Sequence, residues 1–129
     1  MNRLLVLALG LGLVAASGAA QKKPEAKPVT IRGYVVDQMC AVSIGRKADP
    51  MARAAKHTRE CSFHPECASS GFGIFADGKF TKFDTEGSAK ALKALQVSKR
   101  EKGMYYEVTG TMEGDQMAIT SLREIDPPK

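Results

Sequence analysis

All the cysteines and histidines of the chain lie between positions 40 and 67, and two methionines accompany them. These side chains are Cys40, His57, Cys61, His64 and Cys67, with Met39 and Met51 as the methionines. Thiolate, imidazole and thioether groups are the ligands that zinc and copper prefer in proteins. The chemistry to look for in this segment is therefore metal binding, with thiol redox chemistry as its competitor.

Three thiolates and one imidazole make a four-ligand set of Cys40, His57, Cys61 and Cys67. His57 and Cys61 are four residues apart, so a continuous helix would place both side chains on one face. We expect a Cys₃His site for zinc, or a copper site in which Met39 and Met51 can take part.

His64 is the alternative fourth ligand, because Cys61-x-x-His64-x-x-Cys67 is equally compact. The residue before a proline is restricted to extended conformations, and His64 precedes Pro65. His57 is for that reason the preferred imidazole.

A disulfide is the main alternative to a metal at the same cysteines. In an exported protein, two of Cys40, Cys61 and Cys67 would pair and leave one free thiol. A bond from Cys40 to Cys61 or Cys67 would contribute about 3 kcal/mol by closing the loop. The protein would then be a disulfide-stapled interaction module, and the residues alone leave both readings open.

Catalysis is not expected from the motifs present. A thiol enzyme would use Cys67 with His57 or His64 as base, but no motif supplies an orienting group or an oxyanion hole. The chain also lacks CxxC, CxxCH and HExxH motifs. Asp37, three residues before Cys40, is expected to cap the end of the first strand, or else to accept a hydrogen bond from a ligand histidine.

The first twenty residues have the pattern of a secretory signal peptide. Arg3 precedes an apolar stretch from Leu4 to Ala16, which is shorter than the roughly 20 residues that span a membrane. Small residues follow, so cleavage is expected after Ala19 or Ala20, and no cysteine follows that could carry a lipid. The mature protein is expected to be secreted or periplasmic, with no stable membrane anchor.

The length and net charge of the chain indicate a single domain and argue against nucleic-acid binding. The chain has 129 residues, 43% of them hydrophobic, and a formal net charge of +5. Loss of residues 1–20 removes Arg3 and lowers the charge to +4, which is too small an excess to indicate nucleic-acid binding. We expect a flexible leader over 21–28 and a single domain over 29–126, with a Cys/His-rich insertion at 40–70.

Strand and helix signals alternate along this domain. Strands are predicted at Val29–Asp37, at Phe72–Ala76 and Lys79–Phe83 around an Asp77-Gly78 hairpin turn, and at 104–112 and 117–122. Helices are predicted from Pro50 to Arg59 or Glu60, as a short turn from Pro65 through Cys67, and over Thr85–Val97 with a Thr or Ser cap.

This order predicts a mainly β fold with helices: a five-stranded, OB-like barrel with one helix between the third and fourth strands. Gly33 lies where the first strand of such a barrel must bend to pair on both sides. An open five-stranded sheet with a helix on one face is the alternative.

Phe75, Phe80 and Lys82 form a candidate partner surface on the second and third strands. An exposed aromatic and basic patch could bind a protein partner. We favour the other interpretation, in which the aromatic pair packs beneath the insertion.

Three segments resemble a group of uncharacterised small secreted bacterial proteins with an OB-like β-barrel. They are GYVVDQMC (Gly33 to Cys40), HTRECSFHPECASSGFGIF (His57 to Phe75) and YEVTGTMEGDQMAITSL (Tyr106 to Leu122). The resemblance implies a Cys-bearing insertion after the first strand, with Cys40, Cys61 and Cys67 at the cysteine positions of the group. It brings no activity, substrate or cofactor.

Overall fold

The computed structural model describes Gly18 and residues 25–129, which form five strands and five helices. The strands are β1 (Val29–Asp37), β2 (Phe72–Ala76), β3 (Lys79–Phe83), β4 (Tyr105–Glu113) and β5 (Gln116–Glu124). The helices are α1 (Gln38–Gly45), α2 (Pro50–Ala54), α3 (Arg59–Phe63), α4 (Pro65–Ser69) and α5 (Thr85–Val97). The predicted signal peptide and cleavage site lie outside the described residues, apart from Gly18. No helix in the described part of the chain has the length and apolar character needed to cross a membrane.

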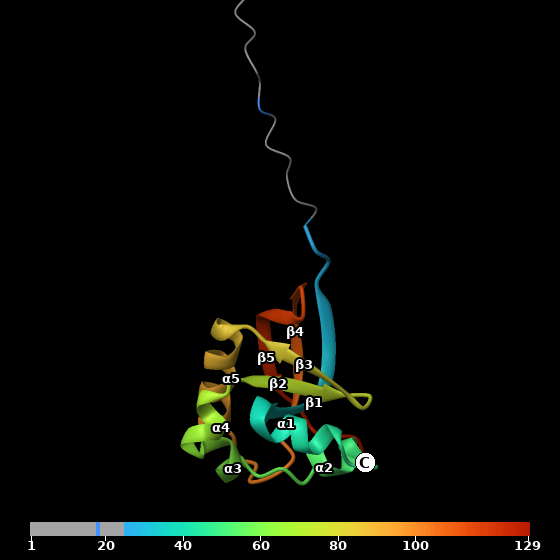
Figure 1. Ribbon diagram of the computed structural model, residues 1–129, viewed down its shortest axis with the longest axis vertical. Coiled ribbons are helices and arrows are strands. Elements are labelled where there is room, and N and C mark those ends of the chain that lie inside the picture. Colours follow the sequence, from blue (N-terminus) through green and yellow to red (C-terminus); the bar gives the residue numbers. More distant parts are fainter. Residues whose placement is uncertain (1–17, 19–24) are drawn as a thin grey trace, which may run out of the picture.

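The five strands form one sheet that closes into a ring in the order β1-β2-β3-β5-β4 (Figure 1). Four of the five strand pairs are antiparallel, and β3 with β5 is parallel. Closure of the ring excludes the alternative of an open sheet. The predicted strands are all present, with bounds that shift by a few residues in β4 and β5.

The first strand pairs with two neighbours, and Gly33 permits the change of partner. Tyr34 is the last residue of β1 to pair with β4, opposite Tyr105, and the first to pair with β2, opposite Phe75. A Cβ atom on Gly33 would lie 2.1 Å from the backbone oxygen of Phe75. Only glycine allows this approach, and the change of partner falls one residue after the position where the sequence predicts a bend.

The β2–β3 hairpin forms as predicted. Asp77 and Gly78 have φ angles of 51° and 75°, which suit a two-residue turn that follows the twist of the strands. Phe75 lies opposite Phe80.

Two clusters of buried side chains stabilise the domain. The larger one joins the inner face of the ring to α5. The N-cap of α5 is Asp84, so the predicted Thr or Ser cap is wrong. It consists of Val35, Phe72, Ile74, Phe83, Ala91, Leu95, Met104, Tyr106, Val108, Met117 and Ile119. The second lies between the outer face of β1–β2 and helices α1 and α2, and includes Val36, Ile44, Ala54 and Phe75.

The prediction of one helix from Pro50 to Arg59 or Glu60 is wrong. Helix α2 ends at Ala54, and α3 begins anew after Thr58, whose backbone is extended and whose hydroxyl caps the N–H of Cys61. Thr58 pairs with Lys102 in an isolated β-bridge, so pairing with the segment before β4 outweighs the helical propensity of this stretch. Helix α1 was not predicted, whereas the short helix at Pro65 was.

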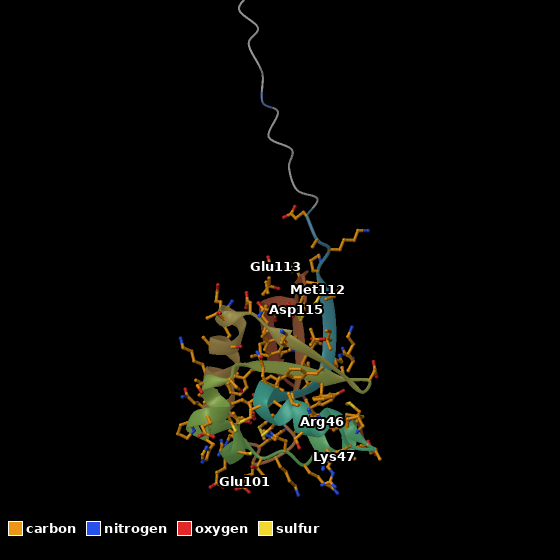
Figure 2. All side chains as sticks on the ribbon, in the orientation of Figure 1. Arg46, Lys47, Glu101, Met112, Glu113 and Asp115 are labelled. Carbon is orange, nitrogen blue, oxygen red and sulfur yellow. The ribbon has the colours of Figure 1, made fainter. Side chains whose placement is uncertain are left out.

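The insertion helices α1–α4 lie together at one end of the molecule (Figure 1). The tip of the β4–β5 hairpin, with Met112, Glu113 and Asp115, lies at the opposite end from Arg46 and Lys47 of the insertion (Figure 2). All the cysteines and histidines are therefore gathered on one end of the closed sheet.

Candidate metal centre

Asp37 is fully buried at the point where β1 ends and α1 begins. Its Oδ1 atom accepts the backbone N–H of Cys40 at 2.8 Å, which caps α1. Its Oδ2 atom lies 3.2 Å from Nε2 of His57. The carboxylate thus caps the helix and also faces a histidine of the candidate ligand set.

His57 lies in the connection between α2 and α3, not on a helix with Cys61 as predicted. Its N–H donates to the carbonyl of Ala54, and its own carbonyl accepts the N–H of Gly103 at 3.0 Å. Gly103 has a φ of +63°, and a Cβ atom there would lie 2.8 Å from the backbone oxygen of Ala55. These contacts hold the His57 side chain so that only 7% of it is exposed.

Buried polar atoms without an aligned hydrogen bond are concentrated at this site. Five such atoms occur among the described residues, and three of them are Asp37 Oδ2 and the two ring nitrogens of His57. The 3.2 Å contact between the two side chains is close, but it lacks hydrogen-bond alignment. Buried polar atoms left unpaired in a native structure call for an explanation such as a water or an ion.

The three thiols converge from three different helices. Cys40 on α1 is half-buried, Cys61 on α3 is exposed and Cys67 on α4 is buried. Their sulfur atoms all lie within 4.8 Å of one another, and Cys40 Sγ is 3.7 Å from Cys61 Sγ. Sulfur ligands about 2.3 Å from a tetrahedral ion are about 3.8 Å apart, so this separation fits two ligands of one metal.

The cysteines are free thiols in this structure. The Sγ atoms of Cys40 and Cys61, 3.7 Å apart, are well beyond the roughly 2.05 Å length of a disulfide bond, and Cys67 is also free. The described residues therefore contain no disulfide, and the predicted staple is not present.

Two groups of candidate ligands share Cys40. One consists of the three cysteines, and the other of Asp37, Cys40 and His57, whose ligand atoms also lie within 4.8 Å of one another. His64 is exposed at the junction of α3 and α4 and belongs to neither group. The structure thus brings His57 next to Cys40 but not into one group with Cys61 and Cys67, so the four predicted ligands are divided between two groups, and His64 lies in neither.

Burial and neighbouring groups shift the pKa values of Asp37 and of two of the thiols in opposite directions. Burial raises the pKa of the Asp37 carboxyl, but the contact with the His57 ring and the N–H of Cys40 outweigh it, and the pKa is lower than usual. Burial first, and then the negative charge of Asp37, raise the pKa of the Cys40 and Cys67 thiols. These thiols therefore hold protons that a bound metal would displace.

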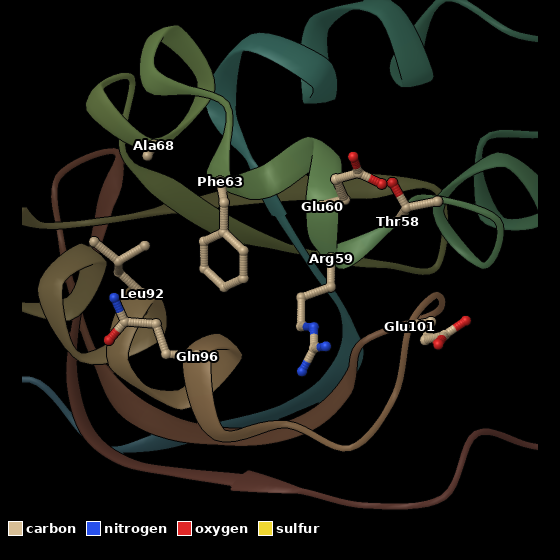
Figure 3. A pocket seen from close by; sticks show the side chains of 8 residues that line it. All are labelled: Thr58, Arg59, Glu60, Phe63, Ala68, Leu92, Gln96 and Glu101. Atoms are coloured by element: carbon tan, nitrogen blue, oxygen red, sulfur yellow. The ribbon is translucent and has the colours of Figure 1, made fainter.

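A groove of the described structure lies beside helices α3, α4 and α5. It has a volume of about 870 Å³, and in Figure 3 the ring of Phe63 points into it. Its lining residues are Thr58, Arg59, Glu60, Phe63, Ala68, Leu92, Gln96 and Glu101. None of these is a cysteine or a histidine, so the candidate metal ligands do not line this groove.

The aromatic partner surface does not form as an exposed patch. Only 1% of Phe75 is exposed, because it packs in the cluster beneath the insertion, as the favoured interpretation predicts. Phe80 is half-buried with its ring centroid 5.2 Å from that of Phe75, and Lys82 forms an ion pair with Asp115 at 2.6 Å.

Comparisons of the chain with protein families, with curated proteins and with solved structures found no match.

Proposed function

We propose that the protein is an exported domain that binds one transition-metal ion, zinc or copper, through the thiolates of Cys40, Cys61 and Cys67. The observation that carries the proposal is the convergence of three sulfurs from three helices within 4.8 Å. Three short helices of five to eight residues meet there, each with a capped or proline-bearing first turn that fixes where its cysteine lies.

His57 is assigned as the fourth ligand and Asp37 as the carboxylate that orients its ring. Metal-bound histidines commonly contact a carboxylate through the second ring nitrogen. The Asp37–His57 contact provides that arrangement beside Cys40, and both side chains have unpaired polar atoms. A Cys₃His set satisfies tetrahedral zinc, whereas copper(I) is satisfied by the three sulfurs.

The proposed fold assignment is an OB-type barrel. Its support is the ring order, the parallel β3–β5 pair, the helix between β3 and β4, and the double pairing of β1. The signal-peptide pattern of the first twenty residues and the resemblance to secreted bacterial proteins support export after cleavage near Ala19 or Ala20. The proposed role is binding and not catalysis.

The test is a metal count combined with alkylation. The reduced protein is offered Zn²⁺ or Cu(I), and its mass is compared under native and denaturing conditions. We expect one ion per chain, lost on denaturation, with all three thiols then alkylated.

Single Cys→Ser variants should retain much less metal, and His57→Ala should weaken zinc retention. His64→Ala is the matched control, since it removes an exposed imidazole from the same insertion and should bind as the unaltered protein does. A reduced protein that binds neither ion would overturn the proposal.

A further inference from the structure

We infer that the metal centre is also a thiol–disulfide exchange site, in which a disulfide-containing oxidant joins Cys40 to Cys61, leaves Cys67 as the free thiol and releases the metal. The release of metal rests on the proposed function. The choice of cysteine pair rests on geometry alone.

Cys40 and Cys61 need only a small movement to form a disulfide. Their sulfur atoms are 3.7 Å apart, so an approach of less than about 2 Å forms the bond. Cys61 lies on α3, a helix of five residues that begins and ends at irregular backbone. A helix this short moves at smaller cost than the closed sheet, because few hydrogen bonds hold it.

Exposure determines which thiol reacts first. Cys61 is exposed, Cys40 is half-buried, and Cys67 is only 8% exposed. An oxidant in solution therefore meets Cys61 before the other two. Cys67 is shielded at the base of the cluster and remains reduced.

The reaction then proceeds in two balanced steps. The Cys61 thiolate attacks one sulfur of the oxidant, which breaks the oxidant's disulfide, releases one thiolate and leaves a mixed disulfide on Cys61. The Cys40 thiolate attacks Cys61 Sγ and displaces the second thiolate of the oxidant. The protein loses two electrons and two thiol protons, and the oxidant becomes two thiols.

The disulfide and the metal exclude each other, because two of the three sulfur ligands become neutral disulfide atoms with little affinity for zinc or copper. Cys67 and His57 remain, and two ligands are too few for a tetrahedral zinc site. Metal occupancy should in turn slow oxidation, because it engages the same thiolates.

The experiment exposes the reduced protein, with and without bound Zn²⁺, to oxidised glutathione. Peptide mapping after alkylation identifies the linked cysteines, and a chromophoric chelator reports released zinc. We expect a Cys40–Cys61 link, an alkylated Cys67 and one zinc ion released per disulfide formed.

Variants separate the roles of the three thiols in the metal-free protein. His64→Ala, outside both ligand groups, is the matched control and should form the disulfide at a rate within about threefold of the unaltered protein, and Cys67→Ser should still form the Cys40–Cys61 link. Cys40→Ser should accumulate the mixed disulfide of glutathione on Cys61. Cys61→Ser should form no disulfide between residues 40 and 61.

The outcomes are distinct for the two proposals. A link that involves Cys67, no link at all, or zinc retained after the Cys40–Cys61 bond forms overturns the exchange site. A reduced protein without metal affinity contradicts the proposed function and the release step. Peptide mapping of the oxidised, zinc-free protein then still shows whether Cys40 and Cys61 form the disulfide.

Discussion

Nε2 of His57 lies 3.2 Å from Oδ2 of Asp37, while Oδ1 of the same carboxylate caps the helix that carries Cys40. One buried side chain thereby links the end of β1, the start of α1 and the connection between α2 and α3. The position of two candidate ligands depends on this single carboxylate, which makes Asp37 the residue to change first.

Asp37→Ala should lower the free energy of unfolding of the metal-free protein by about 2 kcal/mol, because it removes a helix cap and the carboxylate that contacts the buried His57 ring. Urea denaturation measures the change. Asp49→Ala is the control, since Asp49 caps the N–H of Ala52 at an exposed position and should cost about 1 kcal/mol or less. Equal costs at the two positions would contradict the assigned role of Asp37.

The stability contributed by Asp37 should be lost in acid. The pKa of its carboxyl is held below the ordinary value of 3.8, so the charged form is favoured by folding. This contribution is fully present above the ordinary value and disappears as the pH falls through the lowered one. The unaltered protein and Asp37→Asn should therefore differ less in urea midpoint at about pH 3 than at about pH 7. A difference in urea midpoint that is larger at about pH 3 than at about pH 7 would contradict a lowered pKa of Asp37.

Metal affinity should rise with pH. Burial and the charge of Asp37 raise the pKa of the Cys40 and Cys67 thiols, so these groups are protonated at neutral pH and must release protons to bind. The affinity for Zn²⁺ should increase about tenfold per pH unit for each proton released. Competition with a chromophoric chelator between about pH 6 and pH 8 gives the slope. An affinity that does not change with pH would exclude thiol ligands that were protonated.

Glycine is required at one position of β1 and is much less important in the hairpin turn. Gly33→Ala should destabilise the protein by more than about 2 kcal/mol, because the new Cβ would lie 2.1 Å from the Phe75 backbone oxygen. Gly78→Ala is the control: its φ is +75°, but no atom lies within 4 Å of the Cβ position, so about 1 kcal/mol is expected. Thermal unfolding of both variants makes the comparison.

The sheet could be predicted from local patterns because each strand carries its own signal. The β-branched run of Val29–Asp37 and the Asp77-Gly78 turn act over a few residues, and the observed elements follow them. A special role for Gly33 was predictable for the same reason, since a glycine in the middle of a strand often marks a bend or a close approach of another backbone.

The insertion was less predictable because distant contacts determine it. Thr58 pairs with Lys102, and Gly103 donates to the carbonyl of His57, so the helix expected through this segment is interrupted. No periodicity within the insertion carries that information. One signal was available: Gly103 follows a basic stretch after α5 and adopts a positive φ that glycine favours.

The candidate site was predictable in composition but not in arrangement. The clustering of thiols and imidazoles in the sequence pointed to the right segment, and the structure gathers Cys40, Cys61 and Cys67 within it. The proximity of His57 to Asp37 depends on the broken helix, so spacing alone could not reveal it.

X-ray absorption at the zinc edge tests the central claim most directly, because it counts the sulfur atoms bound to the ion. The zinc-loaded, reduced protein should show three sulfur ligands at about 2.3 Å and one nitrogen at about 2.0 Å. Cys61→Ser should lose one sulfur, and His64→Ala should leave the spectrum unchanged. A first shell of nitrogen and oxygen ligands without sulfur would contradict the assignment of the three cysteines as the metal centre.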